Sequence, residues 1–357
     1  MKIGIDAYYI NKPQSSIGIF QYQVLKNMIN DHRDVKFYIF SEFPLTDFKR
    51  QENVKNFNSN SNIINRNIYM KKILKTLDIN VFFATFNLIP LFSKKNFKIV
   101  LQNHDWSHGI FSESLRQYIS GNIYSLMHKH SCKSADINLS NSKFTAKETK
   151  KFCGKESIVI YQDCDPFYKD KNSISQRVNL NIHFEDYILY VGRIYPKYKN
   201  ISSILYAYNK IHNVYKDLKL ILVHTDNYRS DDYKFIKANK LNVIDLKGLP
   251  KENVKFLYEN ALATIYPSLY EGFGFPIVEA QASRSPLIIS DKGPMPEVAA
   301  DSALYFDGSS DDLLEKIQIL ISDKEKRETL REKGYKNAMR FNWKDTSEKI
   351  FKVISDE

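Results

Sequence analysis

The chain has 357 residues, of which 43% are hydrophobic and 26% are charged, as in an ordinary globular protein. This length fits two domains of roughly 150–180 residues each better than one. No apolar run approaches the ~20 residues that a membrane-spanning helix needs, and the amino terminus begins with a strand pattern instead of a signal peptide. We therefore expect a cytoplasmic protein. Cys132, Cys153 and Cys164 show no C-x-x-C spacing, which predicts reduced thiols and no zinc site.

The net charge of +11 is concentrated in the first half of the chain. Residues 1–170 contain 24 Lys and Arg against 15 Asp and Glu, whereas residues 171–357 contain 28 against 26. This composition suits peripheral contact with an anionic membrane and equally suits a solvated basic face. Nucleic acid is disfavoured because no binding motif accompanies the charge. Much of the excess comes from lysines interleaved with apolar residues: Lys71, Lys72, Lys75, Lys94, Lys95 and Lys98.

Short apolar strands alternate with helical patterns along the whole chain, which is typical of parallel α/β sheets. The fold class is therefore α/β, with one sheet in each half. Helical patterns follow the last strand, from 311 to 357. The first half predicts strands at 2–6, 35–40, 81–84, 98–102, 136–140 and 157–161. The second half predicts strands at 187–191, 218–223, 243–246, 263–266, 286–290 and 303–306.

The domain boundary is predicted in the polar segment 166–180, which contains Pro166 and lacks hydrophobic periodicity. Residues 1–165 then form a first domain and residues 181–343 a second. Just before this linker, Asp163-Cys-Asp165 is an Asp-x-Asp pair of the kind that can hold Mg²⁺ or Mn²⁺ on a diphosphate. Because the pair falls at the domain junction, we expect no metal site there.

Residues 266–279 carry the most informative local pattern, a strand followed by a glycine-containing loop and a helix. Gly272 and Gly274 let a ligand approach the backbone, and the N–H groups at the start of the helix favour an anion. Glu271 and Glu279 can each accept hydrogen bonds from a vicinal diol. A phosphate together with sugar hydroxyls indicates a sugar nucleotide. The alternative is a tight turn with two solvated glutamates.

This segment, Tyr266-Pro-Ser-Leu-Tyr-Glu-Gly-Phe-Gly-Phe-Pro-Ile-Val-Glu-Ala280, resembles the E-x7-E motif of retaining glycosyltransferases of family 4 (glycosyl transferases group 1). The resemblance extends over most of the chain, and with Pro294-Met-Pro-Glu-Val298 it is closest to mannosyltransferases. It implies the GT-B fold, in which two Rossmann-like domains with parallel sheets face each other across a cleft. The last helix, about 344–357, would then pack on the first domain.

The resemblance also implies a site for the nucleotide sugar, built mainly by the second domain. Arg193 and Lys199 would hold the diphosphate, with Lys197 as a competitor for the role of Lys199. Glu279 would hold the ribose hydroxyls and Glu271 the hydroxyls of the sugar. The other implied donor contacts are backbone groups or lie near the base: Gly18, Leu249, Gly272, Phe273, Gly274 and Phe275.

On the acceptor side, the resemblance points to His104 and Asp105, which follow the strand at 98–102. A neutral His104 can bond a sugar hydroxyl, and Asp105 can order its loop or orient an acceptor. A buried histidine with a purely structural role is the alternative. The predicted catalytic residues are Glu271, His104, Arg193 and Lys199.

Taken together, these residues imply a retaining hexosyltransferase that needs neither a metal nor another cofactor. Its donor is a nucleoside-diphosphate sugar, with GDP-mannose favoured, and its acceptor is a hydroxyl of a lipid-linked or surface polysaccharide such as O-antigen or capsule. A GT-B epimerase or phosphorylase and a non-catalytic sugar-nucleotide-binding protein are the alternatives.

Overall fold

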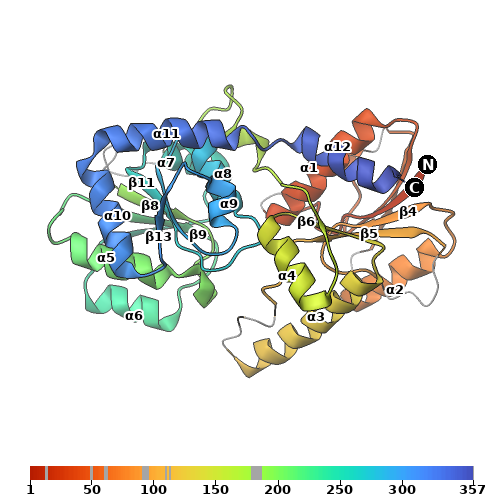
Figure 1. The fold of residues 1–357 in the computed structure, drawn as a ribbon, viewed down its shortest axis with the longest axis horizontal. Coiled ribbons are helices and arrows are strands. Elements are labelled where there is room, and N and C mark those ends of the chain that lie inside the picture. The colour runs from red at the N-terminus through yellow and green to blue at the C-terminus, as the bar shows by residue number, and fades with distance from the viewer. Residues whose placement is uncertain are drawn as a thin grey trace. The chain divides into compact units, whose positions relative to one another are not determined.

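The computed structural model describes residues 1–12, 15–48, 51–59, 63–90, 96–108, 111, 114–177 and 187–356. The chain divides into two compact units, one formed by Met1–Asp163 with Phe341–Glu357 and the other by Cys164–Arg340 (Figure 1). The predicted linker, as far as residue 177, belongs to the second unit, and the predicted domain start at 181 lies outside the described residues. Within the described ranges, no helix is long and apolar enough to cross a bilayer.

The first unit contains a seven-stranded parallel sheet in the order β3-β2-β1-β4-β5-β6-β7. Its central strands are buried along their length, as expected for a sheet covered by helices on both faces. The strands are β1 (Lys2–Asp6), β2 (Lys36–Ser41), β3 (Val54–Asn58), β4 (Val81–Ala84), β5 (Lys98–Asn103), β6 (Ile137–Ser140) and β7 (Ile158–Val159). The helices are α1 (Ser16–Asp31), α2 (Ile63–Leu74), α3 (Leu115–Ser134), α4 (Lys143–Cys153) and α12 (Trp343–Ser355), with the short 3-10 turn η1 (Thr46–Phe48).

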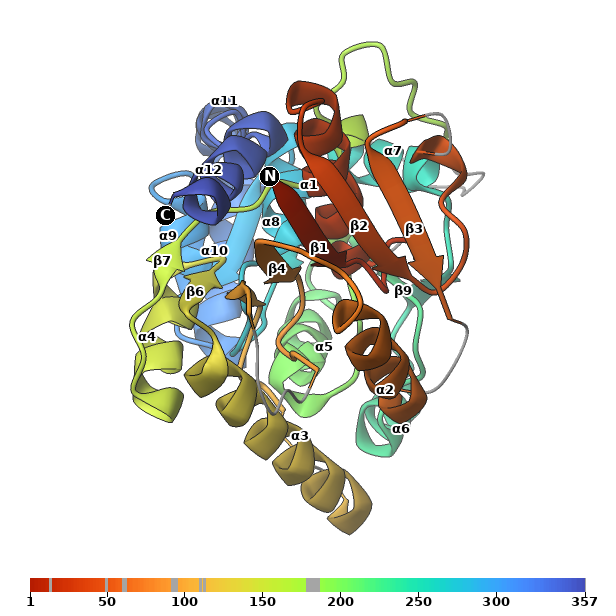
Figure 2. The ribbon, with the colours of Figure 1, turned by 90° about the vertical axis from the view of Figure 1, so that its right-hand side faces the viewer.

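The last helix of the chain, α12, packs on the first, α1 (Figure 2). Ser347 Oγ donates to the carbonyl of Val24 at 3.0 Å, and the rings of Phe20 and Trp343 lie 6.1 Å apart. Asn342 caps the start of α12 by accepting from two backbone N–H groups. The carboxyl end of the chain therefore completes the first unit.

The second unit contains a six-stranded parallel sheet in the order β10-β9-β8-β11-β12-β13. Its strands are β8 (Tyr187–Val191), β9 (Lys219–His224), β10 (Val243–Lys247), β11 (Ala263–Tyr266), β12 (Leu287–Ser290) and β13 (Leu304–Phe306). Its helices are α5 (Ile201–Ile211), α6 (Ser230–Ala238), α7 (Lys251–Asn260), α8 (Phe275–Ala282), α9 (Met295–Ala299), α10 (Ser310–Ser322) and α11 (Lys324–Ala338), with the 3-10 turns η2 (Pro166–Tyr168) and η3 (Lys197–Lys199).

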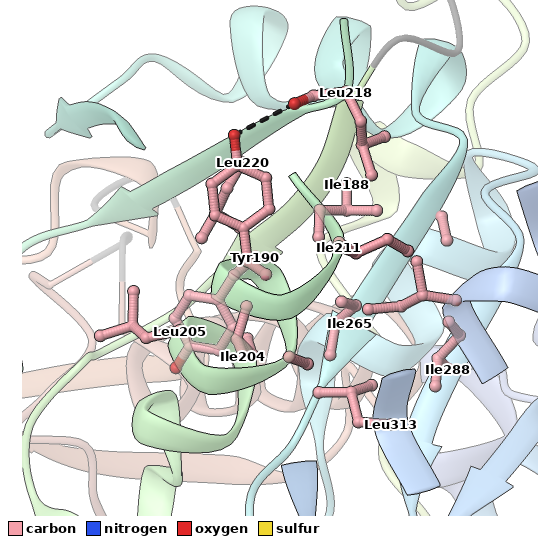
Figure 3. Close-up of a cluster of buried hydrophobic side chains, with 14 of the residues drawn as sticks. Ile188, Tyr190, Ile204, Leu205, Ile211, Leu218, Leu220, Ile265, Ile288 and Leu313 are labelled. Carbon is pink, nitrogen blue, oxygen red and sulfur yellow. Dashed lines mark hydrogen bonds between the residues drawn. The ribbon is translucent and has the colours of Figure 1, made fainter. Parts of the chain in front are cut away.

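The core of the second unit lies where β8, β9, β11 and β12 meet α5 and α10 (Figure 3). Tyr208 of α5 is buried and keeps its hydroxyl satisfied by donating to the carbonyl of Leu218 at 3.0 Å. Burial of aliphatic side chains holds the strands rigidly, so the loops at their carboxyl ends start from fixed positions. The cluster includes Ile188, Tyr190, Ile204, Leu205, Ile211, Leu220, Ile265, Ile288 and Leu313.

Two features of the first unit differ from the sequence analysis. The edge strand β3 was not predicted, because Val54-Lys-Asn-Phe-Asn58 is polar and only partly buried. The expectation of three reduced thiols was also wrong: Cys132 at the end of α3 is joined by a disulfide to Cys153 at the end of α4, while Cys164 is buried outside this disulfide. The two cysteines are 21 residues apart, so their spacing gave no sign of the pairing.

Candidate functional site

The second sheet has a topological switch point at β8, which lies between β9 and β11. In open parallel sheets, the loops that leave two neighbouring strands in opposite directions form a crevice at their carboxyl ends, and ligands bind there. The loops concerned are residues 192–200 after β8 and residues 267–274 after β11. Both contain residues that the sequence analysis assigned to the sugar nucleotide.

The loops after β8, β11 and β12 are held together by direct contacts. The N–H of Leu269 donates to the carbonyl of Tyr198 at 2.7 Å, which ties the loop after β11 to η3. Ser290 Oγ, at the end of β12, donates to the carbonyl of Ser268. A Cβ added to Gly293 would lie 3.6 Å from the backbone nitrogen of Glu271, so the loop after β12 passes close to it. These contacts fix the backbone around Glu271.

Lys199 and Glu271 form the most buried ion pair among the predicted site residues. Lys199 Nζ donates to Glu271 Oε1 at 2.6 Å, and the two side chains are only 13% and 15% exposed. Burial raises the pKa of the neighbouring Tyr266 well above its ordinary value, and the charge of Glu271 adds to this effect. Lys197, in the same 3-10 turn, is exposed. The geometry therefore pairs Glu271 with Lys199.

Arg193 is oriented by an acid that the sequence analysis did not name. Arg193 Nε donates to Asp226 Oδ2 at 3.3 Å, while the rest of this side chain remains largely exposed at 62%. Asp226 also accepts from the backbone N–H groups of Ile194 at 2.8 Å and Tyr195 at 3.1 Å. Asp226 thus orders the turn after β8 and leaves the guanidinium accessible. It follows β9 without any recognisable motif, so nothing in the sequence marked it.

The helix α8 begins at a turn that requires glycine. Gly274 is the residue before the helix and has φ of 104°, a left-handed conformation that other residues rarely adopt. A Cβ at this position would also lie 2.9 Å from Cδ1 of Ile277. Phe273 and Phe275 on either side are buried, with their rings 5.8 Å apart. The backbone around Gly272 and Gly274 therefore enters α8 in one defined conformation.

Glu279 lies on α8, one turn beyond its start, and is half-buried. The pKa of Glu279 is raised to about 7, mainly by burial and in addition by the nearby charge of Asp165, whereas the hydroxyl of Tyr258 opposes the shift by donating to Oε2 at 3.4 Å. Near neutral pH this carboxyl therefore changes between an acceptor-only carboxylate and a protonated acid.

In the first unit, His104 is buried and both of its ring nitrogens have partners. Nε2 lies 2.8 Å from the carbonyl of Thr85, and Nδ1 lies 3.3 Å from Nε2 of Gln162. Burial lowers the pKa of His104 to about 4, so the ring is neutral at physiological pH. These contacts agree with the alternative that His104 is a buried histidine with a structural role. A hydrogen bond from its ring to a sugar would have to replace one of them.

Asp105 orders its own loop, one of the two roles expected for it. Its Oδ1 accepts from the backbone N–H of Ser107 at 2.9 Å and from the hydroxyl of Ser107 at 2.6 Å. Gly18 lies near the start of α1, where its N–H donates to Ser15 Oγ at 3.0 Å. A Cβ on Gly18 would lie 2.1 Å from the carbonyl oxygen of Lys12, so glycine is needed here for backbone packing. The donor contact expected of Gly18 stays a prediction.

The remaining expected residues lie at the borders of the second unit. Leu249 follows β10, the edge strand next to β9, and is partly exposed. Asp165 caps η2 by accepting from the N–H of Phe167 at 2.9 Å and pairs with Lys251 at 3.1 Å. Among the residues that the structure describes, no three His, Cys, Asp or Glu side chains are grouped to hold a metal ion.

Two parallel-sheet α/β domains with these loops define a GT-B fold, and the fold class is confirmed by solved structures. Sucrose-phosphate synthase from Thermosynechococcus elongatus has a TM-score of 0.75 over 99% of this chain and 98% of its own, at 16% identity. Anabaena HepE, solved in complex with UDP and glucose, has a TM-score of 0.73 over 99% of each chain, at 18% identity. At these identities the likeness concerns the fold alone.

Residues 173–337 match the family model of glycosyl transferases group 1, which confirms the resemblance drawn from the E-x7-E motif over this part of the chain. O-antigen chain mannosyltransferase B from Escherichia coli is 30% identical over 167 residues, 45% of this chain and 44% of its own. O-antigen chain mannosyltransferase RfbU from Salmonella typhimurium is 31% identical over 176 residues, which are 46% of this chain and 49% of its own. These matches thus span about half the length of each relative.

Proposed function

We propose that this chain is a retaining glycosyltransferase that moves a hexosyl unit, mannose in the first instance, from a nucleoside-diphosphate sugar to a glycan hydroxyl. The observation that carries the proposal is the buried pair of Lys199 and Glu271 at the switch point of the second sheet, beside the start of α8. Lys199 and Arg193 would neutralise the diphosphate, and the N-terminal end of α8 would add partial positive charge. Glu271 would accept hydrogen bonds from the sugar and Glu279 from the ribose.

The favoured donor is GDP-mannose and the favoured acceptor is a lipid-linked or surface polysaccharide such as O-antigen or capsule. The support comes from the relatives: two are O-antigen chain mannosyltransferases, and a third is the Staphylococcus aureus capsular polysaccharide glycosyltransferase CapM, 28% identical over 179 residues. Such an acceptor is made at a membrane, and the basic first unit suits peripheral contact with anionic lipid.

The experiment is to incubate the purified chain with GDP-mannose and a panel of other nucleoside-diphosphate sugars, with and without a polyprenyl-linked glycan acceptor. We expect acceptor-dependent release of the nucleoside diphosphate from one donor, undiminished by a chelator. NMR of the product should show that the anomeric configuration of the donor is kept. Release without any acceptor dependence, or activity that needs Mn²⁺, would contradict the proposal.

Retention in this fold needs no protein nucleophile when the leaving phosphate helps to deprotonate the acceptor. We therefore assign Glu271 to donor positioning and charge stabilisation. Mass spectrometry of the protein after incubation with a slow donor analogue checks this assignment. The proposal predicts unmodified Glu271, whereas a glycosyl ester on its carboxylate would show that it acts as a nucleophile.

A further inference from the structure

Helix α3 carries large apolar side chains on its exterior. Leu115 is 74% exposed, Tyr118 55%, Ile119 52%, Ile123 55% and Leu126 66%. Exposed apolar residues scattered singly are ordinary on a protein surface, but a contiguous group on one element marks an interaction surface. We call these five residues the α3 stripe.

The spacing of the α3 stripe places its members on one face of the helix. An α-helix turns by about 100° per residue, so positions separated by three, four, seven or eight residues lie on the same side. Leu115, Ile119 and Leu126 form the centre of the stripe, and Lys133 lies in line with them further along. Figure 2 shows α3 extending beyond the other helices of its unit, with its N-terminal end away from the sheet, and every residue from 114 to 120 is exposed.

The charges on α3 are of one sign. Arg116, Lys129 and Lys133 lie within residues 115–134, and this segment contains no Asp or Glu. A second copy docked through the same helix would bring like charges against one another, which disfavours association. An anionic lipid surface instead offers phosphates to the cations and acyl chains to the stripe. Charge complementarity therefore selects a lipid surface as the occupant.

We propose that α3 is the membrane-docking element of this chain, with the stripe buried at the boundary between headgroups and acyl chains of an anionic bilayer. The inference deepens the proposed peripheral contact and rests on it, but it is independent of the proposed chemistry because the stripe lies outside the second unit. Of the lysines considered from the sequence, Lys98 donates to the carbonyls of Val353 and Asp356. Lys94 and Lys95 lie outside the described residues.

The test is co-sedimentation of the full chain with vesicles of phosphatidylcholine alone and of equal parts phosphatidylcholine and phosphatidylglycerol. The variant Leu115→Ser/Leu126→Ser removes two apolar side chains from the stripe. The matched control, Ile174→Ser/Val214→Ser, removes two side chains of the second unit that are 78% and 73% exposed. We expect the unchanged chain and the control to bind anionic vesicles equally, and the stripe variant to bind about tenfold more weakly or worse. Added salt should weaken binding because it screens the cations.

A second measurement locates the contact on the helix. The native tryptophans, Trp106 and Trp343, are buried. Ile119→Trp should shift its emission to the blue when anionic vesicles are added, and Val214→Trp should not. Equal binding by the stripe and control variants, or an unshifted Ile119→Trp, would overturn the proposal. The proposal would also be overturned if the unchanged chain self-associates, the stripe variant is monomeric, and neither of the two binds vesicles. The rise in Tm that the nucleoside diphosphate causes should be unchanged in the stripe variant, so a failure of docking remains distinct from a failure of the proposed function.

Discussion

At the scale of single residues, the central feature is that Lys199 and Glu271 neutralise each other at a distance of 2.6 Å. A buried cation or carboxylate without a partner is costly, so the pair keeps both charged groups in place in the absence of a ligand. When the donor binds, the diphosphate can replace Glu271 as the partner of Lys199. The sugar hydroxyls can replace Lys199 as the partners of Glu271. The ion pair is thus a preorganised form of the proposed donor site.

This assignment predicts different outcomes for two neighbouring lysines. Lys199→Ala should slow transfer by about 10²–10³-fold, the usual loss when one group that stabilises developing charge is removed. Lys197→Ala, an exposed residue of the same 3-10 turn, should change the rate little. Steady-state rates of nucleotide release, with circular dichroism to verify folding, provide the check. A larger loss for Lys197→Ala would show that the roles are reversed.

Glu279 should make donor affinity depend on pH. Its pKa is raised to about 7, so the carboxyl is protonated below this value and ionised above it. Ribose hydroxyls donate to the ionised form, so affinity should rise with pH, by about tenfold between one unit below and one unit above the pKa. Calorimetry with GDP-mannose is suitable because its diphosphate diester does not titrate in this range. Glu279→Gln should bind with the same affinity at each pH, and a slope that persists in this variant would rule out Glu279 as its source.

At the scale of elements, the start of α8 depends on the conformation of one glycine. Gly274→Ala would strain a backbone with φ of 104° and push a Cβ to 2.9 Å from Ile277 Cδ1. Gly154, which ends α4 with φ of 71° and has nothing within 4 Å of the added Cβ, is the matched control. We expect Gly154→Ala to lower the free energy of unfolding by about 1 kcal/mol and Gly274→Ala by roughly twice as much or more. Urea denaturation measures both, and equal losses would contradict the close contact at Ile277.

The strands of both sheets were largely predictable, because apolar segments buried on two faces stand out from their polar surroundings. β1, β4, β8 and β11 have the predicted bounds. The strand β3 escaped prediction because an edge strand buries little and can remain polar, as Lys55 and Asn56 do. The hydrophobic periodicity of a segment therefore predicts whether a strand is buried better than it predicts whether the segment pairs in the sheet.

The partners within the candidate site were less predictable than its motifs. Lys199 and Glu271 are 72 residues apart, and Arg193 and Asp226 are 33 apart. Only the order of strands in the sheet brings such residues together. The burial of both ring nitrogens of His104 against Thr85 and Gln162 likewise arises from tertiary packing. A motif names the residue types, whereas the fold decides which of them meet.

At the scale of the whole molecule, nucleotide binding should raise the free energy of unfolding of the chain. A ligand at 100 times its Kd adds roughly 2.7 kcal/mol to the free energy of unfolding, which is readily seen as a rise in Tm. We expect the nucleoside diphosphate of the true donor to raise Tm more than the other nucleotides do. Glu279→Gln should reduce this rise, because it removes the acceptor of the ribose hydroxyls. A rise of equal size for every base would mean that only the diphosphate is recognised.

The central claim is that the loops after β8 and β11 form the donor site of a glycosyltransferase. Its most direct test is the release of nucleoside diphosphate from a panel of nucleotide sugars by the purified chain, by Lys199→Ala and by Glu271→Gln. We expect release from one donor by the unchanged chain, with transfer to an acceptor, and a loss of about 10²-fold or more in both variants. Turnover that persists in both variants, or no release from any donor, would contradict it.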